Sequence, residues 1–164
     1  MTSPALILSS LFLLAAPATD DPRVELVEFQ LARQYSDALA RTEEMIASDP
    51  ALADDLWLRY LRGHLLDELG RDKDAHEAFA QLLGADSDLA AYARLRMARM
   101  QAEMGHPEVA AGLVATLLGS GAPPETVEPA AKLLVETLAA GADCRLLGRL
   151  DAWQVPDPER RRLQ

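Results

Sequence analysis

The sequence predicts an all-α fold, and three observations lead to this class. Apolar residues recur every three or four positions, which is the spacing of one face of a helix. Aspartates and prolines begin these stretches, and glycines end several of them. No stretch shows the alternation of apolar and polar residues that is expected of half-buried strands.

The first two helices are defined by their end signals. Asp21 is placed to cap a helix whose first residue is Pro22, where the missing N–H of proline has no cost. Ser36 is expected to cap a second helix that reaches Ser48, and Pro50 is expected to close it.

The third and fourth helices are separated by a glycine. Residues 54–69 are predicted to be helical because they carry one leucine stripe at spacings of three and four: Leu58, Leu61, Leu65 and Leu69. Gly70 stops this helix. Asp72 can cap the next one, which is expected to run to about Leu83 and to end at Gly84.

Three further helices follow. Asp88 opens one that ends at Gly105, and one of its faces carries Ala93, Met97, Met100 and Met104. Pro107 begins the next, which reaches Leu118 before a break at residues 119–124. The last is expected from about Pro124 to Ala140.

The end of the chain is less regular. A shorter helical piece is expected at residues 145–153. In residues 154–164, Asp157 and Pro158 resemble a helix start. This segment is therefore either a tail or the beginning of a further helix.

The N-terminus predicts a cleavable secretory signal at residues 1–18. Residues 5–16 are uncharged, but this run is shorter than the roughly 20 residues of a membrane-spanning helix. Ala16 and Ala18 supply small residues at the spacing of a signal-peptidase site. No lysine or arginine precedes the run, so a buried first helix or an uncleaved anchor stays open. Cleavage would leave no stable membrane span and a periplasmic or secreted chain.

The charge of the chain restricts its partners. The formal net charge is −10, which disfavours the phosphates of nucleic acids and anionic bilayers. A protein or peptide with a neutral or basic surface is the expected partner. The single cysteine, Cys144, cannot form a disulfide within the chain, and the sequence fixes neither its redox state nor the oligomeric state.

No catalytic or metal site is predicted. The segment HEAFA at residues 76–80 begins as a zinc-protease helix does, but Ala80 stands where the second histidine ligand is required. Ser120 lacks the spacing of a nucleophile elbow, and Gly119–Gly121 follows no strand that would make it a phosphate-binding loop. We therefore expect no enzyme, no cofactor and no metal within this chain.

Small residues repeat along the chain. An offset of 35 residues superposes four pairs: Gly63 on Ala98, Gly70 on Gly105, Ala75 on Ala110 and Phe79 on Val114. Small residues at a helix crossing allow two helices to approach to about 8 Å. The glycine interior to a helix at position 63 is therefore expected to serve packing, although it costs about 1 kcal/mol relative to alanine.

These residues resemble the tetratricopeptide repeat family, a helix-turn-helix unit. Gly63, Gly70, Ala75 and Phe79 stand at the family's spacing, and Ala38 and Pro50 match in the first unit. That unit departs from the pattern because Arg33 replaces the turn glycine and Leu26 replaces a small residue, as a terminal cap would. The second unit has Arg59 in place of tryptophan and Ser87 in place of the closing proline. The resemblance covers about residues 22–120, with a partial fourth unit beyond. It implies a right-handed α-α superhelix of about three to four hairpins, in a repeat domain at residues 19–153.

The resemblance also implies a concave face, formed mainly by the first helix of each unit. The matching positions are Trp57, Tyr60, His64, Asp67 and Glu68 in the second unit and Tyr92, Leu95, Arg99, Ala102 and Glu103 in the third. We expect Trp57, Tyr60, His64, Tyr92 and Arg99 to bind the partner, because aromatic residues and arginine are frequent interface anchors. Alternatively, the three aromatic side chains pack partly between repeats.

Three functions remain open. The first is an exported interaction scaffold in the bacterial cell envelope, which binds a protein or peptide in its concave groove. The second is the N-terminal superhelical region of a larger envelope enzyme, similar to that of soluble lytic murein transglycosylases. The third is a structural spacer, in which the concave aromatic residues are unused.

Overall fold

The predicted all-α class is confirmed. The computed structural model describes residues 21–143, 145 and 161–162, in which seven α-helices, one 3₁₀-helix and no strand are found. The predicted signal at residues 1–18 lies outside the described residues. So do the predicted piece at 145–153 and the segment 154–164, apart from Arg145, Arg161 and Arg162.

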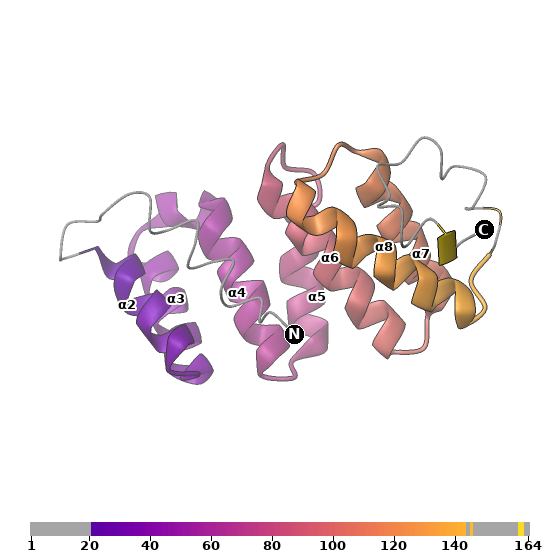
Figure 1. Cartoon of the computed structure of the whole chain (residues 1–164). Coiled ribbons are helices and arrows are strands. Elements are labelled where there is room, and N and C mark those ends of the chain that lie inside the picture. The colour runs from indigo at the N-terminus through magenta and orange to yellow at the C-terminus, as the bar shows by residue number, and fades with distance from the viewer. Residues whose placement is uncertain (1–20, 144, 146–160, 163–164) are drawn as a thin grey trace. The chain divides into compact units, whose positions relative to one another are not determined.

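The chain divides into two compact units. Unit 1 is Met1–Ala75 and unit 2 is His76–Gln164, so that the boundary falls inside helix α5, Asp72–Ala80. Each unit is built from helices joined by short turns (Figure 1).

In unit 1, α2 (Pro22–Leu31) packs against α3 (Tyr35–Ser48), which packs against α4 (Leu56–Glu68). The 3₁₀-helix η1 (Pro50–Asp54) connects α3 to α4 and contacts both. Pro50 was predicted to close the helix that reaches Ser48, and α3 does end at Ser48. Pro50 is also the first residue of η1, a position that its fixed φ suits.

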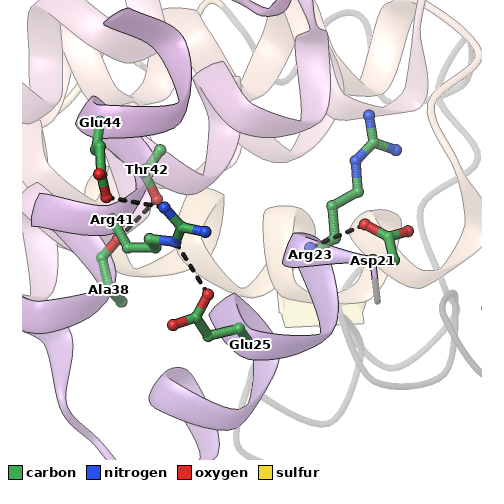
Figure 2. Close-up of polar contacts among 7 residues, drawn as sticks. All are labelled: Asp21, Arg23, Glu25, Ala38, Arg41, Thr42 and Glu44. Carbon is green, nitrogen blue, oxygen red and sulfur yellow. Dashed lines mark hydrogen bonds and ion pairs between the residues drawn. The ribbon is translucent and has the colours of Figure 1, made fainter. Parts of the chain in front are cut away.

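Aspartate side chains fix three of the helix starts in unit 1. Asp21, Asp49 and Asp55 cap α2, η1 and α4, and each accepts a hydrogen bond of 2.9 or 3.0 Å from a backbone N–H two or three residues further on. Such a cap satisfies one of the N–H groups that a helix start leaves unpaired, and is typically worth about 1 kcal/mol. The predicted cap at Asp21 is confirmed, and Figure 2 shows its bond to the Arg23 backbone.

Polar side chains join α2 to α3. The Arg41 guanidinium donates to Glu25 of α2 at 2.9 Å and to Glu44 of its own helix at 2.8 Å (Figure 2). The hydrogen bonds to Glu44 and then Glu25 raise the pKa of Arg41 above its ordinary value. The buried Thr42 hydroxyl donates to the Ala38 carbonyl at 2.8 Å, which satisfies it inside the helix.

In unit 2, α6 (Asp88–Glu103), α7 (Pro107–Gly119) and α8 (Pro124–Ala139) each contact the other two. Figure 1 shows the three helices packed along one another. Their shared core is rich in alanine: Ala91, Leu95, Ala98, Ala111, Val114, Ala115, Leu117, Leu118, Ala130, Ala131, Leu133, Leu134 and Ala142. Because alanine adds little bulk at a crossing, the helix axes can approach closely.

The small residues that the repeat pattern singled out are buried. Ala38, Ala75, Ala98 and Ala110 are fully shielded from solvent, and Gly63 is also buried. Phe79, which follows one of them by a helical turn, is the largest fully buried side chain of the described residues. The packing role predicted for these positions therefore agrees with the structure.

One turn geometry recurs at four helix ends. Arg33, Gly70, Gly105 and Gly141 all have positive φ, and they are separated by 35 to 37 residues. At each, the next N–H donates at 2.8 to 3.0 Å to the carbonyl five residues earlier, which is the Schellman pattern. The turn repeats even where Arg33 replaces glycine.

Four predicted helix details are wrong, and the turns explain them. Ser36 is not a cap, because α3 begins at Tyr35, directly after the turn at Arg33. Leu69 and Met104 were expected inside their helices, but each follows the last helical residue, and both are exposed. α5 ends at Ala80 instead of Leu83, since the N–H groups of residues 82 and 83 bond to carbonyls three residues back.

Candidate functional site

The five predicted partner-binding residues lie on two helices. Trp57, Tyr60 and His64 belong to α4 of unit 1, and Tyr92 and Arg99 belong to α6 of unit 2. Within α4 the three residues are spaced by three and four positions and therefore share one face.

The α4 residues are largely occupied by the protein itself. Tyr60 and His64 are 6% and 5% exposed, so neither offers much surface to a partner. The His64 Nδ1 lies 3.8 Å from a Glu68 carboxylate oxygen one turn further along. Trp57 is half-buried.

Arg23 of α2 contacts the ring of Trp57. The Arg23 guanidinium carbon lies 5.6 Å from the centroid of the Trp57 ring, within the range of a cation–π contact. The same guanidinium donates at 2.5 Å to Asp55, the cap of α4. The contact occupies part of Trp57, and whether the aromatic side chains pack between repeats stays a prediction.

Tyr92 makes a comparable contact in unit 2. Its hydroxyl donates to a Glu125 carboxylate oxygen at 2.6 Å, which joins the first half of α6 to the first turn of α8. This hydrogen bond, assisted by a backbone hydrogen bond at Glu125, lowers the pKa of Glu125 below its ordinary value of 4.5. The bond therefore links two helices whose bonded residues are 33 positions apart in the sequence.

Further along the same two helices lies a surface hollow of about 430 Å³. We call it the α6–α8 hollow, and it is lined by Arg99, Ala102, Glu103, Lys132, Leu133 and Glu136. Arg99 was predicted to bind a partner, and Ala102 and Glu103 stand at concave positions of the same helix. The structure thus brings three predicted concave positions together.

The sequence reasoning missed the α8 side of this hollow. Lys132, Leu133 and Glu136 stand in the partial fourth unit, to which no register was assigned. A signal was nevertheless present, because Arg99 and Glu103 recur 33 positions later as Lys132 and Glu136. At an offset of 35, the distance between Gly70 and Gly105, the two charge pairs do not align.

Three of the four charged side chains of the hollow are available for a ligand. Arg99 is half-buried, whereas Glu103, Lys132 and Glu136 are exposed. The last three side chains make no hydrogen bond or ion pair with any residue that the structure describes. Leu133 is buried and gives the hollow an apolar floor beneath them.

Two other hollows differ from it in chemistry rather than size. One of about 480 Å³ lies between residues 85–94 and 120–123, and its arginine, Arg94, donates to the Leu83 carbonyl. One of about 410 Å³ is lined by residues of α3 and by Leu69 and Arg71, and Arg71 is paired with Asp74 at 2.6 Å. The α6–α8 hollow combines a predicted binding residue with uncommitted charges of both signs.

In the part of the chain that the structure describes, no helix is both long and apolar enough to cross a membrane. No group of three or more histidine, cysteine, aspartate or glutamate side chains is placed there to hold a metal ion.

Comparisons with protein-family models, with curated proteins and with solved structures find no match to this chain. The tetratricopeptide assignment therefore stays a prediction, and it depends on the small residues, the turns and their spacing.

Proposed function

We propose that this chain is an exported scaffold that binds a protein or peptide partner through the α6–α8 hollow. The observation that carries the proposal is the composition of this hollow. Cations from both helices, carboxylates from both helices and an apolar floor meet in about 430 Å³. Such a mixture suits a polypeptide, which offers charged side chains, apolar stems and backbone polar groups together.

The finer architecture that we propose is a right-handed superhelix of tetratricopeptide-like hairpins. Support comes from the turn geometry that recurs at four helix ends and from the buried small residues at the family's positions. In such an array each helical pair packs on its neighbours, and the first helices of the pairs line one binding face.

The location that we propose is the periplasm or the cell exterior. This part of the proposal depends on the uncharged run at residues 5–16 and the small residues Ala16 and Ala18 that follow. We expect no nucleic acid partner, because the net charge of −10 repels phosphates.

The predicted binding residues take different parts in this proposal. Arg99 contacts the partner directly, as a wall of the hollow. Tyr92 and Trp57 are half-buried, so part of each side chain stays exposed in addition to its contact with Glu125 or Arg23. Tyr60 and His64 support α4 from inside, because both are buried.

Capture from a cell-envelope extract tests the function when a paired variant is included. We expect the chain to retain a specific protein and the double variant Glu103→Ala/Lys132→Ala to lose most of it. The control is Lys73→Ala/Glu77→Ala, which also removes one charge of each sign, from exposed positions of α5 outside the hollow. Equal capture by the chain and the hollow variant would contradict the proposal.

A further inference from the structure

The side chain of Arg23 lies in a small site at the start of α4. Its guanidinium carbon is 5.6 Å from the centroid of the Trp57 ring, and its Nη2 donates at 2.5 Å to Oδ2 of Asp55. An aromatic face attracts a guanidinium by the cation–π effect, and a carboxylate accepts a charge-assisted hydrogen bond from it. Trp57 and Asp55 therefore form a guanidinium site, the Trp57–Asp55 site, which an arginine of the same chain fills.

Both walls of the site belong to α4 rather than to α2. Trp57 is the second residue of α4, and Asp55 is its N-cap. Oδ1 of Asp55 accepts a hydrogen bond of 3.0 Å from the Leu58 N–H, which anchors the carboxylate and leaves Oδ2 for the guanidinium. Because the helix itself holds these two groups, we expect the site to keep its shape when Arg23 leaves it.

Arg23 comes from the helix of unit 1 that is anchored least. In α2 only Leu26 is buried, whereas seven residues of α4 are buried. The Arg23 side chain is already 35% exposed, so water can solvate its guanidinium outside the site, and an ion pair exposed to this degree adds little stability. The Asp21 cap bonds to the Arg23 backbone and not to its guanidinium (Figure 2), so the start of α2 does not depend on where the guanidinium lies.

The chemistry of the site suits a cation from another polypeptide. The carboxylate of Asp55 repels an anionic ligand, and the net charge of −10 attracts basic segments toward the chain. Arginine suits the site better than lysine, because a planar guanidinium can stack on the Trp57 ring and donate to a carboxylate at the same time.

We propose that an arginine of a polypeptide partner occupies the Trp57–Asp55 site and displaces Arg23. Arg23 is then an internal competitor, which the partner's arginine has to replace. The proposal goes beyond the proposed function and is independent of it, because the Trp57–Asp55 site lies in unit 1 and the α6–α8 hollow lies in unit 2.

Removal of the internal arginine tests the proposal. The sequence has two tryptophans, so Trp153→Phe leaves Trp57 as the fluorescent probe in every chain compared. The ligands are acetyl-Gly-Arg-Gly-amide and the same peptide with citrulline, which has nearly the shape of arginine and no charge. We expect the arginine peptide to bind Arg23→Ala in the millimolar range and the chain that keeps Arg23 about tenfold more weakly, because a group on the same chain competes at a high effective concentration. The citrulline peptide should bind neither.

Two further variants identify the groups that bind. Arg23→Ala/Asp55→Asn keeps a side chain that can cap α4 but removes its charge, and we expect it to lose the arginine peptide. The control Arg41→Ala removes the other ion pair of α2, with Glu25, and should bind as weakly as the chain that keeps every arginine. Circular dichroism spectra compare the helix content of all the variants. If Arg23→Ala loses helix, Arg23→Gln provides the same test with a longer uncharged side chain.

Three results would overturn the proposal. One is equal binding of the arginine and citrulline peptides, and another is equal affinity with and without Arg23. The third is unchanged binding when Asp55→Asn is added to Arg23→Ala. A charge-dependent gain on removal of Arg23 that also requires Asp55 supports it.

Discussion

At the scale of single residues, the most informative position is Arg33. Its φ of 57° lies in the left-handed region, which the glycines at the three equivalent turns occupy without strain. An exposed arginine there gains no packing that would compensate. The geometry of the turn is therefore imposed by the helices that it joins, at some cost to the residue in its centre.

We predict that Arg33→Gly stabilises the chain. Removing the Cβ relieves about 1 kcal/mol of left-handed strain, and the greater freedom of glycine in the unfolded chain offsets part of it. A net gain of about 0.5 kcal/mol, or a rise in Tm of about 1 to 2 °C, is expected in a thermal melt.

Gly105→Ala is the matched control for the turn. A Cβ built on Gly105 meets no atom within 4 Å, so no steric clash adds to the backbone strain. Because alanine is also less free than glycine in the unfolded chain, we expect that variant to lose about 0.5 kcal/mol. A lower Tm for Arg33→Gly would contradict the prediction, because it would show that the arginine side chain adds more stability than the backbone strain at this position takes away.

At the scale of helices, the sequence was a good guide to which segments fold and a poorer one to where they end. The apolar period and the proline and glycine signals identified the seven α-helices, because both follow from local geometry. The ends at Ser36, Leu69 and Leu83 depended on hydrogen bonds of the turns, which residue types alone do not specify.

Only the α6 half of the candidate site could be predicted from the sequence. Arg99 and Glu103 could be placed on a concave face because the turn glycine at position 105 fixed the register of their helix. The residues of α8 line the same hollow because α6 and α8 pack on each other. Such packing is a tertiary property, and the recurrence of the charge pair 33 positions later does not by itself specify it.

The Tyr92–Glu125 hydrogen bond leads to a prediction about pH. Because the pKa of Glu125 is lower in the folded chain than its ordinary value of 4.5, its carboxylate stabilises the fold above that pH. The contribution disappears as the pH falls through the folded-state pKa. We therefore expect Tyr92→Phe to reduce the free energy of unfolding at pH 7. In strong acid the contribution of Glu125 is already lost, so the variant should cause no loss from this source.

The loss should be small, about 0.5 kcal/mol or less, because both groups are in contact with water. Urea unfolding at several pH values measures it, and NMR titration should show the pKa of Glu125 rising in the variant. Tyr35→Phe is the control, since the Tyr35 hydroxyl makes no hydrogen bond with any residue in the described part of the chain. A pKa of Glu125 that does not change in Tyr92→Phe would contradict the assigned cause.

At the scale of the whole molecule, charge is the property that the sequence determines most directly. The 26 acidic residues outnumber the 16 basic ones, which gives a net charge of −10 and an isoelectric point near 4.7. Residues 1–18 contain no charged side chain, so removal of a signal would leave this balance unchanged. Solubility should therefore depend on pH in the same way before and after cleavage.

We predict that the chain self-associates most strongly near pH 4.7, where mutual repulsion between molecules disappears. Light scattering across pH 3.5 to about 8 should show one maximum there. Added salt should raise the scattering at neutral pH toward the value at this maximum, because salt screens the repulsion between molecules.

Above pH 6 the chain should bind neither duplex DNA nor anionic vesicles. Salt-sensitive DNA binding at neutral pH would show instead that a local cluster of cations, such as Arg99 with Lys132, outweighs the charge of the whole molecule.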